Sequence, residues 1–108
     1  MKPKESDWKR FRSSLDKWRE RYLKRKNAEI LAILEDKYLS ETEKFWNIVQ
    51  FQKTEAKILR NCLDGFSRSN MDMHMSMMKE VGMIRKEDIA EFSNDLKEYL
   101  GRIGRIGQ

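Results

Sequence analysis

The side chains best suited to chemistry in this sequence are the bases of its first quarter. Residues 1–26 contain eleven Lys and Arg against four Asp and Glu, a net charge of +7, whereas residues 27–108 carry twelve bases and fourteen acids, a net charge of −2. Such a basic segment can bind phosphates, and each phosphate contact releases counterions and adds salt-dependent affinity. The candidate nucleic-acid-binding residues are Lys9, Arg10, Arg12, Lys17, Arg19, Arg21, Lys24, Arg25 and Lys26.

Large apolar residues are threaded through the same basic segment. They share one stripe of a helix and comprise Trp8, Phe11, Leu15, Trp18 and Tyr22. Trp8, Trp18 and Tyr22 could stack on the bases of a single-stranded ligand, but packing the stripe inward leaves only the cationic face free. The alternative is a solvated face over a core stripe, with Asp16 and Glu20 pairing some of the bases. An acidic protein or an anionic membrane surface would fit the same face.

A second candidate for chemistry is the methionine-rich stretch 71–78. Thioethers are soft ligands that select Cu(I), and the run Met73-His74-Met75 resembles methionine-rich copper-binding segments. Methionine also fills irregular helical cores and forms adaptable protein-binding surfaces. We expect this stretch to pack in a core, with a contact surface as the alternative, and we predict no metal site and no cofactor.

Nucleophilic catalysis would need Cys62, the only cysteine, with His74, the only histidine, as its base. Such a pair requires spatial contact and a third group that orients the base, so we expect a buried, inert thiol. The sequence has no glycine-rich phosphate loop, no zinc-ligand spacing and no pair of carboxylates singled out for acid–base work. We therefore predict that the protein is not an enzyme.

The elements that must position these residues are all helical. Hydrophobic spacing predicts an all-α, four-helix bundle-like domain over residues 1–108, with helices over about 7–38, 41–64, 70–81 and 86–100. Ser6 or Asp7 can cap the first helix, and Ser40 and Glu43 have the spacing of a capping box. Residues 1–5 and 102–108 are expected to be mobile tails, because the repeated Gly-Arg-Ile places a glycine at every third position after residue 100.

The length of the first helix raises the question of assembly. About 30 residues make a helix roughly 45 Å long, whereas a compact chain of this size is roughly 35 Å across. The helix must overhang its domain, bend near Asn27 or pack against a second copy. We predict a homodimer, because a two-fold interface is the common way to cover an exposed apolar stripe. Its expected interface is Trp8, Phe11, Leu15, Trp18 and Tyr22.

The function expected from these features is non-enzymatic binding or regulation. The preferred partner is nucleic acid, DNA or RNA, contacted through the basic face of the N-terminal helix. The alternative is a protein–protein adaptor for an acidic partner, such as an adaptor of phage or mobile-element origin, with the methionine-rich helix as its contact surface. A single cysteine, no long apolar run and no visible signal peptide lead us to expect a cytoplasmic protein without a transmembrane segment.

Overall fold

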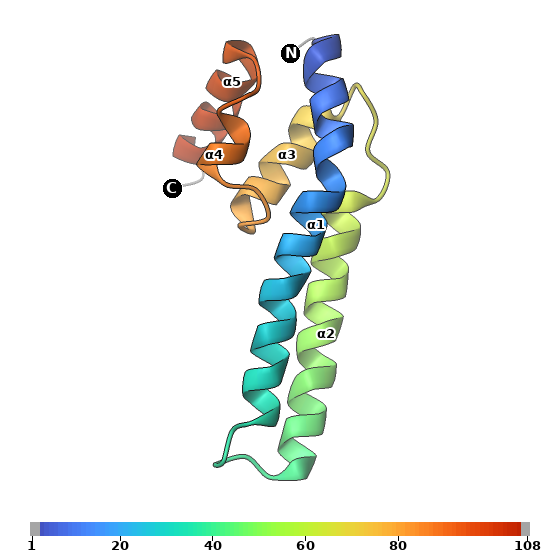
Figure 1. Ribbon diagram of the computed structural model, residues 1–108, viewed down its shortest axis with the longest axis vertical. Coiled ribbons are helices and arrows are strands. Elements are labelled where there is room, and N and C mark those ends of the chain that lie inside the picture. Colours follow the sequence, from blue (N-terminus) through green and yellow to red (C-terminus); the bar gives the residue numbers. More distant parts are fainter. Residues whose placement is uncertain (1–2, 107–108) are drawn as a thin grey trace.

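Helices account for all the regular structure in this computed structural model, which describes residues 3–106 and their side chains as far as Arg102. The helices α1 (Glu5–Leu34) and α2 (Glu41–Leu63) lie side by side and antiparallel (Figure 1). Three shorter helices, α3 (Met71–Glu80), α4 (Lys86–Ile89) and α5 (Asn94–Ile106), gather around the N-terminal half of α1. The predicted all-α class is confirmed.

The first helix overhangs its own domain rather than bending. The molecule measures 52 × 28 × 22 Å, and α1 and α2 project together along the longest axis (Figure 1). We call residues 23–61 the arm, and α3, α4, α5 with residues 5–22 of α1 the head. The helix α1 ends at Leu34, four residues earlier than expected, and Tyr38 lies exposed in the connection to α2.

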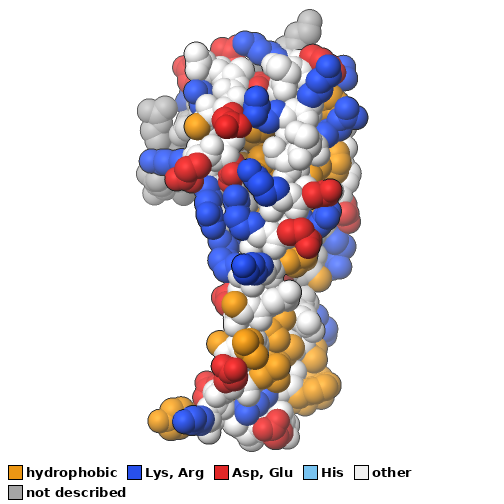
Figure 2. All heavy atoms as spheres, viewed as in Figure 1, with side chains coloured by type: hydrophobic (Ala, Val, Ile, Leu, Met, Phe, Trp, Pro, Cys, Tyr) orange, Lys and Arg blue, Asp and Glu red, His pale blue; other side chains and the backbone are white. Residues whose placement is uncertain are grey.

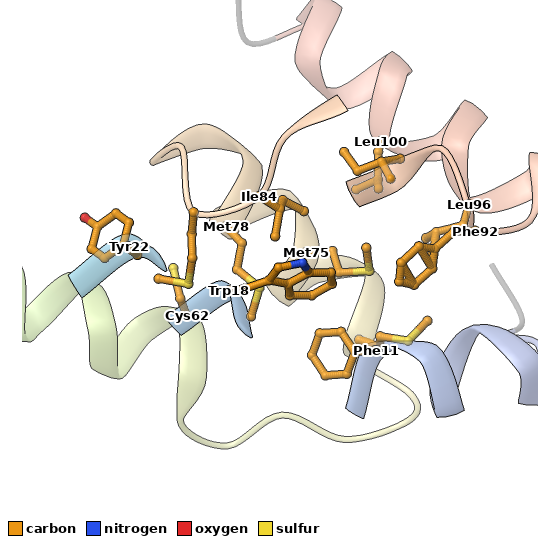
Figure 3. Packing of buried hydrophobic residues seen from close by; sticks show 13 residues of the cluster. Phe11, Trp18, Tyr22, Cys62, Met75, Met78, Ile84, Phe92, Leu96 and Leu100 are labelled. Atoms are coloured by element: carbon orange, nitrogen blue, oxygen red, sulfur yellow. The ribbon is translucent and has the colours of Figure 1, made fainter. Parts of the chain in front are cut away.

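The hydrophobic core lies in the head and includes Cys62 near the end of α2, together with Met83 and Ile84 from the connection between α3 and α4. Trp18 occupies its middle, with Met75 and Phe92 close to the indole (Figure 3) and the ring centroids of Trp18 and Phe92 6.2 Å apart. Met75 is fully buried, as are Met71 and Met78. The expectation that the methionine-rich stretch packs in a core is confirmed. The flexible thioethers fill the irregular space around the large indole.

The expected dimer interface is corrected by the structure. Phe11, Trp18 and Tyr22 are at most 2% exposed, because α3, α4 and α5 fold back over this stripe. Trp8 and Leu15 are partly buried and pack against the same core. These side chains already have their partners within the chain, so they cannot form a seam with a second copy.

Local signals set most of the helix ends. The amide of Glu43 donates to Ser40 Oγ at 3.1 Å and the amide of Ser40 donates to Glu43 Oε1 at 2.9 Å, which confirms the capping box. Gly65, just after α2, has φ of +73° and Gly82, just after α3, has φ of +77°. Both glycines adopt the left-handed conformation that ends a helix and that other residues rarely adopt.

The expected helix over 86–100 is instead two helices, separated at 90–93. Ser93 Oγ accepts a hydrogen bond from the amide of Leu96 at 3.3 Å, which starts α5. The Ser93 amide and hydroxyl donate to the Asp7 carboxylate at 2.9 and 2.6 Å. Asp7 is 4% exposed and clamps the first turn of α1 to this break, so it does not cap α1, which already begins at Glu5.

The C-terminal glycines do not end the last helix where the sequence suggested. The helix α5 continues to Ile106, through most of the Gly-Arg-Ile repeat that was expected to prevent it. Leu100 is buried in the core, and its carbonyl oxygen accepts a hydrogen bond from Lys79 Nζ at 3.1 Å. This packing holds α5 immediately before its glycine-rich end. Residues 1–2 and 107–108 of the expected tails lie outside the described residues.

The clamp between Asp7 and Ser93 provides a test of the fold. The substitution Asp7→Ala removes two hydrogen bonds to a buried charge and should lower the free energy of unfolding by about 2–3 kcal/mol. The matched control is Asp16→Ala, since the Asp16 side chain is 86% exposed on the same helix. It should change the same quantity by less than about 0.5 kcal/mol. Urea unfolding measures both, and equal losses would contradict the clamp.

Candidate nucleic-acid interface

The nine basic residues predicted to contact nucleic acid fall into two groups in the structure. Four have carboxylate partners within the chain. Their ion pairs are Arg10 with Glu91 at 2.7 Å, Arg19 with Asp16 at 3.1 Å, Lys26 with Glu29 at 3.2 Å, and Arg21 with Asp88. The other five are exposed and have no carboxylate partner among the described residues; they are Lys9, Arg12, Lys17, Lys24 and Arg25.

Four bases of α1 share one face of the helix. Lys17, Arg21, Lys24 and Arg25 follow one another at spacings of four, three and one, which places them along a single side of about two turns. The loop between α3 and α4 lies against this face. Arg25 Nη1 donates to the carbonyl oxygen of Gly82 at 3.3 Å.

Arg21 anchors the same loop from the middle of the face. Its Nη2 donates to the carbonyl oxygen of Met83 at 3.1 Å, and its Nη1 donates to Asp88 Oδ1 at 3.2 Å. These contacts carry Arg85 and Lys86, both exposed, to the level of α1 where the head meets the arm. Lysine and arginine side chains gather there in Figure 2. We call this set the basic junction; it comprises Lys17, Arg21, Lys24, Arg25, Arg85 and Lys86.

Arg85 and Lys86 were missed by the sequence analysis. They lie about 60 residues from the other bases, and residues 86–100 as a whole are acidic. The one local signal is Gly82, whose φ of +77° turns the chain back along α1. A β-carbon at Gly82 would lie 3.3 Å from Arg25 Nη2, so the turn also allows the guanidinium to approach closely.

Asp88 is the carboxylate that holds the junction together. Its burial opposes ionisation, but hydrogen bonds from the Arg21 guanidinium and the Arg85 amide outweigh this effect, and Arg21 and Lys17 add their positive charge. The pKa of Asp88 is therefore below its ordinary value. The junction contains six bases, whereas the neighbouring α4 contributes two acids, Glu87 and Asp88, so the surface stays cationic.

The aromatic side chains are not arranged to stack on nucleobases. Trp18 and Tyr22 are buried, and burial together with the hydrogen bond from the Tyr22 hydroxyl to Glu55 raises the pKa of Tyr22. Trp8 is partly buried and stacks on Phe11, with 5.9 Å between the ring centroids, while the Arg12 guanidinium lies 5.4 Å from the indole. The arrangement is suited to phosphates rather than to bases.

The structure also shows how the other candidate residues for chemistry, Cys62, His74 and the methionines, are arranged. His74 Nδ1 lies 2.7 Å from the carbonyl oxygen of Cys62, so the ring is bound to the backbone of that residue and not to its thiol. Burial raises the pKa of the Cys62 thiol, which disfavours the reactive thiolate. Met73 is 50% exposed whereas Met75 is fully buried, so the two thioethers point to different environments. No group of three His, Cys, Asp or Glu in the described part could hold a metal ion.

Comparison with protein-family models, curated proteins and solved structures found no match. No helix in residues 3–106 is long and apolar enough to cross a membrane. The function must therefore be inferred from the basic junction and the exposed bases of α1.

The ion pair of Asp88 and Arg21 should make stability depend on pH. The pKa of Asp88 is lowered in the folded protein. The ionised Asp88 therefore stabilises the fold fully above the ordinary carboxyl pKa of about 4, and this stabilisation is lost as the pH falls through the pKa that Asp88 has in the folded protein. Asp88→Asn should lower the free energy of unfolding by about 1–3 kcal/mol at pH 7. At pH 2 this difference should shrink toward zero.

The control for this prediction is Glu91→Gln. Glu91 also pairs with an arginine, Arg10, but its side chain is 71% exposed. Exposed ion pairs contribute about 0–1 kcal/mol, so this variant should differ little from the wild type at either pH. Urea unfolding at both pH values measures the differences. A deficit of Asp88→Asn that is equally large at pH 2 would show that the lost interaction is not the ionised pair.

Proposed function

We propose that this protein is a non-enzymatic nucleic-acid-binding protein that contacts phosphates through the basic junction. The observation that supports it is the convergence of Lys17, Lys24 and Arg25 from α1 with Arg85 and Lys86 from the start of α4, about 60 residues away. A solvated helix face does not need a second basic segment tied against it by hydrogen bonds. Lys9 and Arg12 extend the cationic surface along the outside of the head.

The proposed binding depends little on nucleotide sequence. Lysine and arginine contacts to phosphates position a protein on nucleic acid and carry no sequence information. The aromatic rings that could read single-stranded bases are occupied by the core, as described for Trp18 and Tyr22. DNA and RNA share the phosphates that the junction would bind, so the proposal covers both, and the affinity should fall steeply with salt.

An adaptor for an acidic protein is the competing function for the same bases. Its expected contact surface, the methionine-rich helix, has Met71, Met75 and Met78 fully buried in the core, whereas Met73 is 50% exposed, which gives the adaptor less support than the basic junction gives nucleic acid. Affinity capture from the native host with and without nuclease separates the two functions. Partners that all disappear after nuclease treatment support nucleic acid, and a protein partner that persists supports the adaptor.

We also propose that the protein forms a homodimer. The long α1 still presents apolar side chains that the chain does not cover, although they lie at Leu31 and Leu34 rather than on the stripe that was expected. A homodimer would bring two basic junctions into one particle and lengthen the cationic surface.

Charge reversal in the junction tests the nucleic-acid proposal. Lys17→Glu and Arg85→Glu should each weaken binding to duplex DNA or RNA, and each should reduce the slope of log affinity against log salt by about 1 per lost phosphate contact. The matched control is Lys37→Glu, which makes the same charge change in the exposed connection at the tip of the arm. Fluorescence anisotropy over a salt series measures the slopes. Equal slopes for all four proteins, or no binding at low salt, would overturn the proposal.

A further inference from the structure

The helix α2 carries a second set of bases outside the basic junction. They are Lys53, Lys57 and Arg60, which are all exposed and have no carboxylate partner in the part of the chain that the structure describes. The other exposed residues between positions 50 and 61 are four uncharged polar side chains, so this stretch exposes no acid and no hydrophobic residue. We call the three bases the α2 face.

The spacing of the α2 face brings like charges together. Lys57 lies four residues after Lys53 and three before Arg60, so the three positive charges are neighbours on the helix surface. Like charges at these spacings destabilise a helix. Nearer the start of α2, Lys44 has an acid at the same spacing and pairs with Glu41 at 3.3 Å. A bound polyanion would relieve the repulsion within the α2 face.

The α2 face points away from α1. Glu55 marks the side of α2 that faces α1, because it accepts a hydrogen bond from the Tyr22 hydroxyl at 2.5 Å and pairs with Lys26 at 3.7 Å. Each residue turns an α-helix by about 100°. Lys53 and Lys57 each lie two residues from Glu55, so both project from the opposite side of α2.

The basic junction points in the other direction. Tyr22 and Lys26 face α2, and Lys24 lies midway between them in the sequence, so Lys24 projects away from α2. Because Tyr22 and Lys26 both contact Glu55, the two basic faces lie at the same level on opposite sides of the layer that α1 and α2 form. Figure 2 shows Lys and Arg side chains at this level on both the α1 edge and the α2 edge of the molecule.

The thickness of this layer keeps the two basic faces apart. Packed helices have axes about 8–10 Å apart and side chains that reach about 5–6 Å from each axis, so the layer is roughly 20 Å thick. Duplex DNA has a persistence length of about 150 bp and does not bend around so thin a layer. A duplex bound to the basic junction therefore leaves the α2 face free for a second one.

We propose that a single chain bridges two nucleic-acid duplexes, with one on the basic junction and the other on the α2 face. The inference rests on the proposed function, because it assigns the same ligand to both faces. Interfaces with nucleic acid are polar and strongly positive, as the α2 face is. An interface with an acidic protein has an apolar centre, and the exposed residues between positions 50 and 61 offer none.

The two faces should differ in strength. The α2 face offers three bases, whereas the junction offers five that lack a carboxylate partner among the described residues, namely Lys17, Lys24, Arg25, Arg85 and Lys86. Each phosphate contact adds about 0.9 to the slope of log affinity against log salt. Rising salt should therefore weaken both faces but release the duplex on the α2 face first.

The first experiment measures bridging with two short duplexes, one held on beads and the other carrying a fluorophore. Wild type at low salt should retain the labelled duplex on the beads. As salt rises, the labelled duplex should leave while the protein stays bound. Fluorescence anisotropy with one duplex alone measures single-duplex binding for comparison.

Neutralising the α2 face should separate bridging from single-duplex binding. The variant K57Q/R60Q should lower the retained duplex at least about tenfold, because it removes two of the three phosphate contacts, and should change single-duplex affinity less than about threefold. The matched control is K37Q/R102Q, which removes two exposed bases outside both faces and should match wild type in both measurements. Circular dichroism should show both variants folded. Equal proportional losses of bridging and of single-duplex affinity in K57Q/R60Q would contradict a separate second face.

The second experiment determines how many chains form one bridge. Native mass spectrometry with excess duplex should show one chain with two duplexes. Two chains with two duplexes, or bridging that persists in K57Q/R60Q, would assign the bridge to self-association through two junctions and overturn the inference. Wild type that binds a duplex in anisotropy but retains none on the beads would also overturn it and leave the proposed function standing. Only a chain that binds no duplex at low salt would end both.

Discussion

A hydrophobic core needs elements on more than two sides, and α1 has them only along its first 18 residues. Its buried side chains, Asp7, Phe11, Trp18 and Tyr22, all lie in that part. Beyond Tyr22, α1 has α2 as its neighbour, and two helices side by side leave every side chain partly open to solvent. The division of the molecule into head and arm follows from this limit. The placement of the basic junction also follows from it, because the junction lies where α3 and α4 stop covering α1 and the head meets the arm.

Local signals in the sequence predicted the elements well. The capping box of Ser40 and Glu43 and the terminating Gly65 act within a few residues, so their geometry follows from residue type and spacing. The break before Asn94 has a local signal as well, since Ser93 is a favoured N-cap residue. The sequence analysis nevertheless predicted one helix over 86–100, because the helical spacing of apolar residues continues across Ser93. The link that fixes the break, from Ser93 to Asp7, crosses 86 residues and has no local trace.

The sequence indicated which bases belong to the candidate site, but not which carboxylates they pair with. The sequence singled out the bases of α1 as the cationic element, but the partners that neutralise some of them lie far away in the chain. Arg21 meets Asp88 across 67 residues, and Arg10 meets Glu91 across 81. Helical periodicity cannot show such pairs. It also cannot show that the stripe of Phe11 and Trp18 is covered by the C-terminal helices, so exposure was inferred from length alone.

One consequence concerns the unbroken course of α1 through both regions. The turns of α1 around Phe11, Trp18 and Tyr22 are covered by the buried core, whereas those near Leu34 have one neighbouring helix. A single helix therefore contains amides of very different protection, with exchange increasing from the head toward the tip. Because the helix is continuous, ordering at the tip adds turns to a helix that is already nucleated in the head. The arm thus avoids the entropic cost of starting a helix, and what it lacks is tertiary packing.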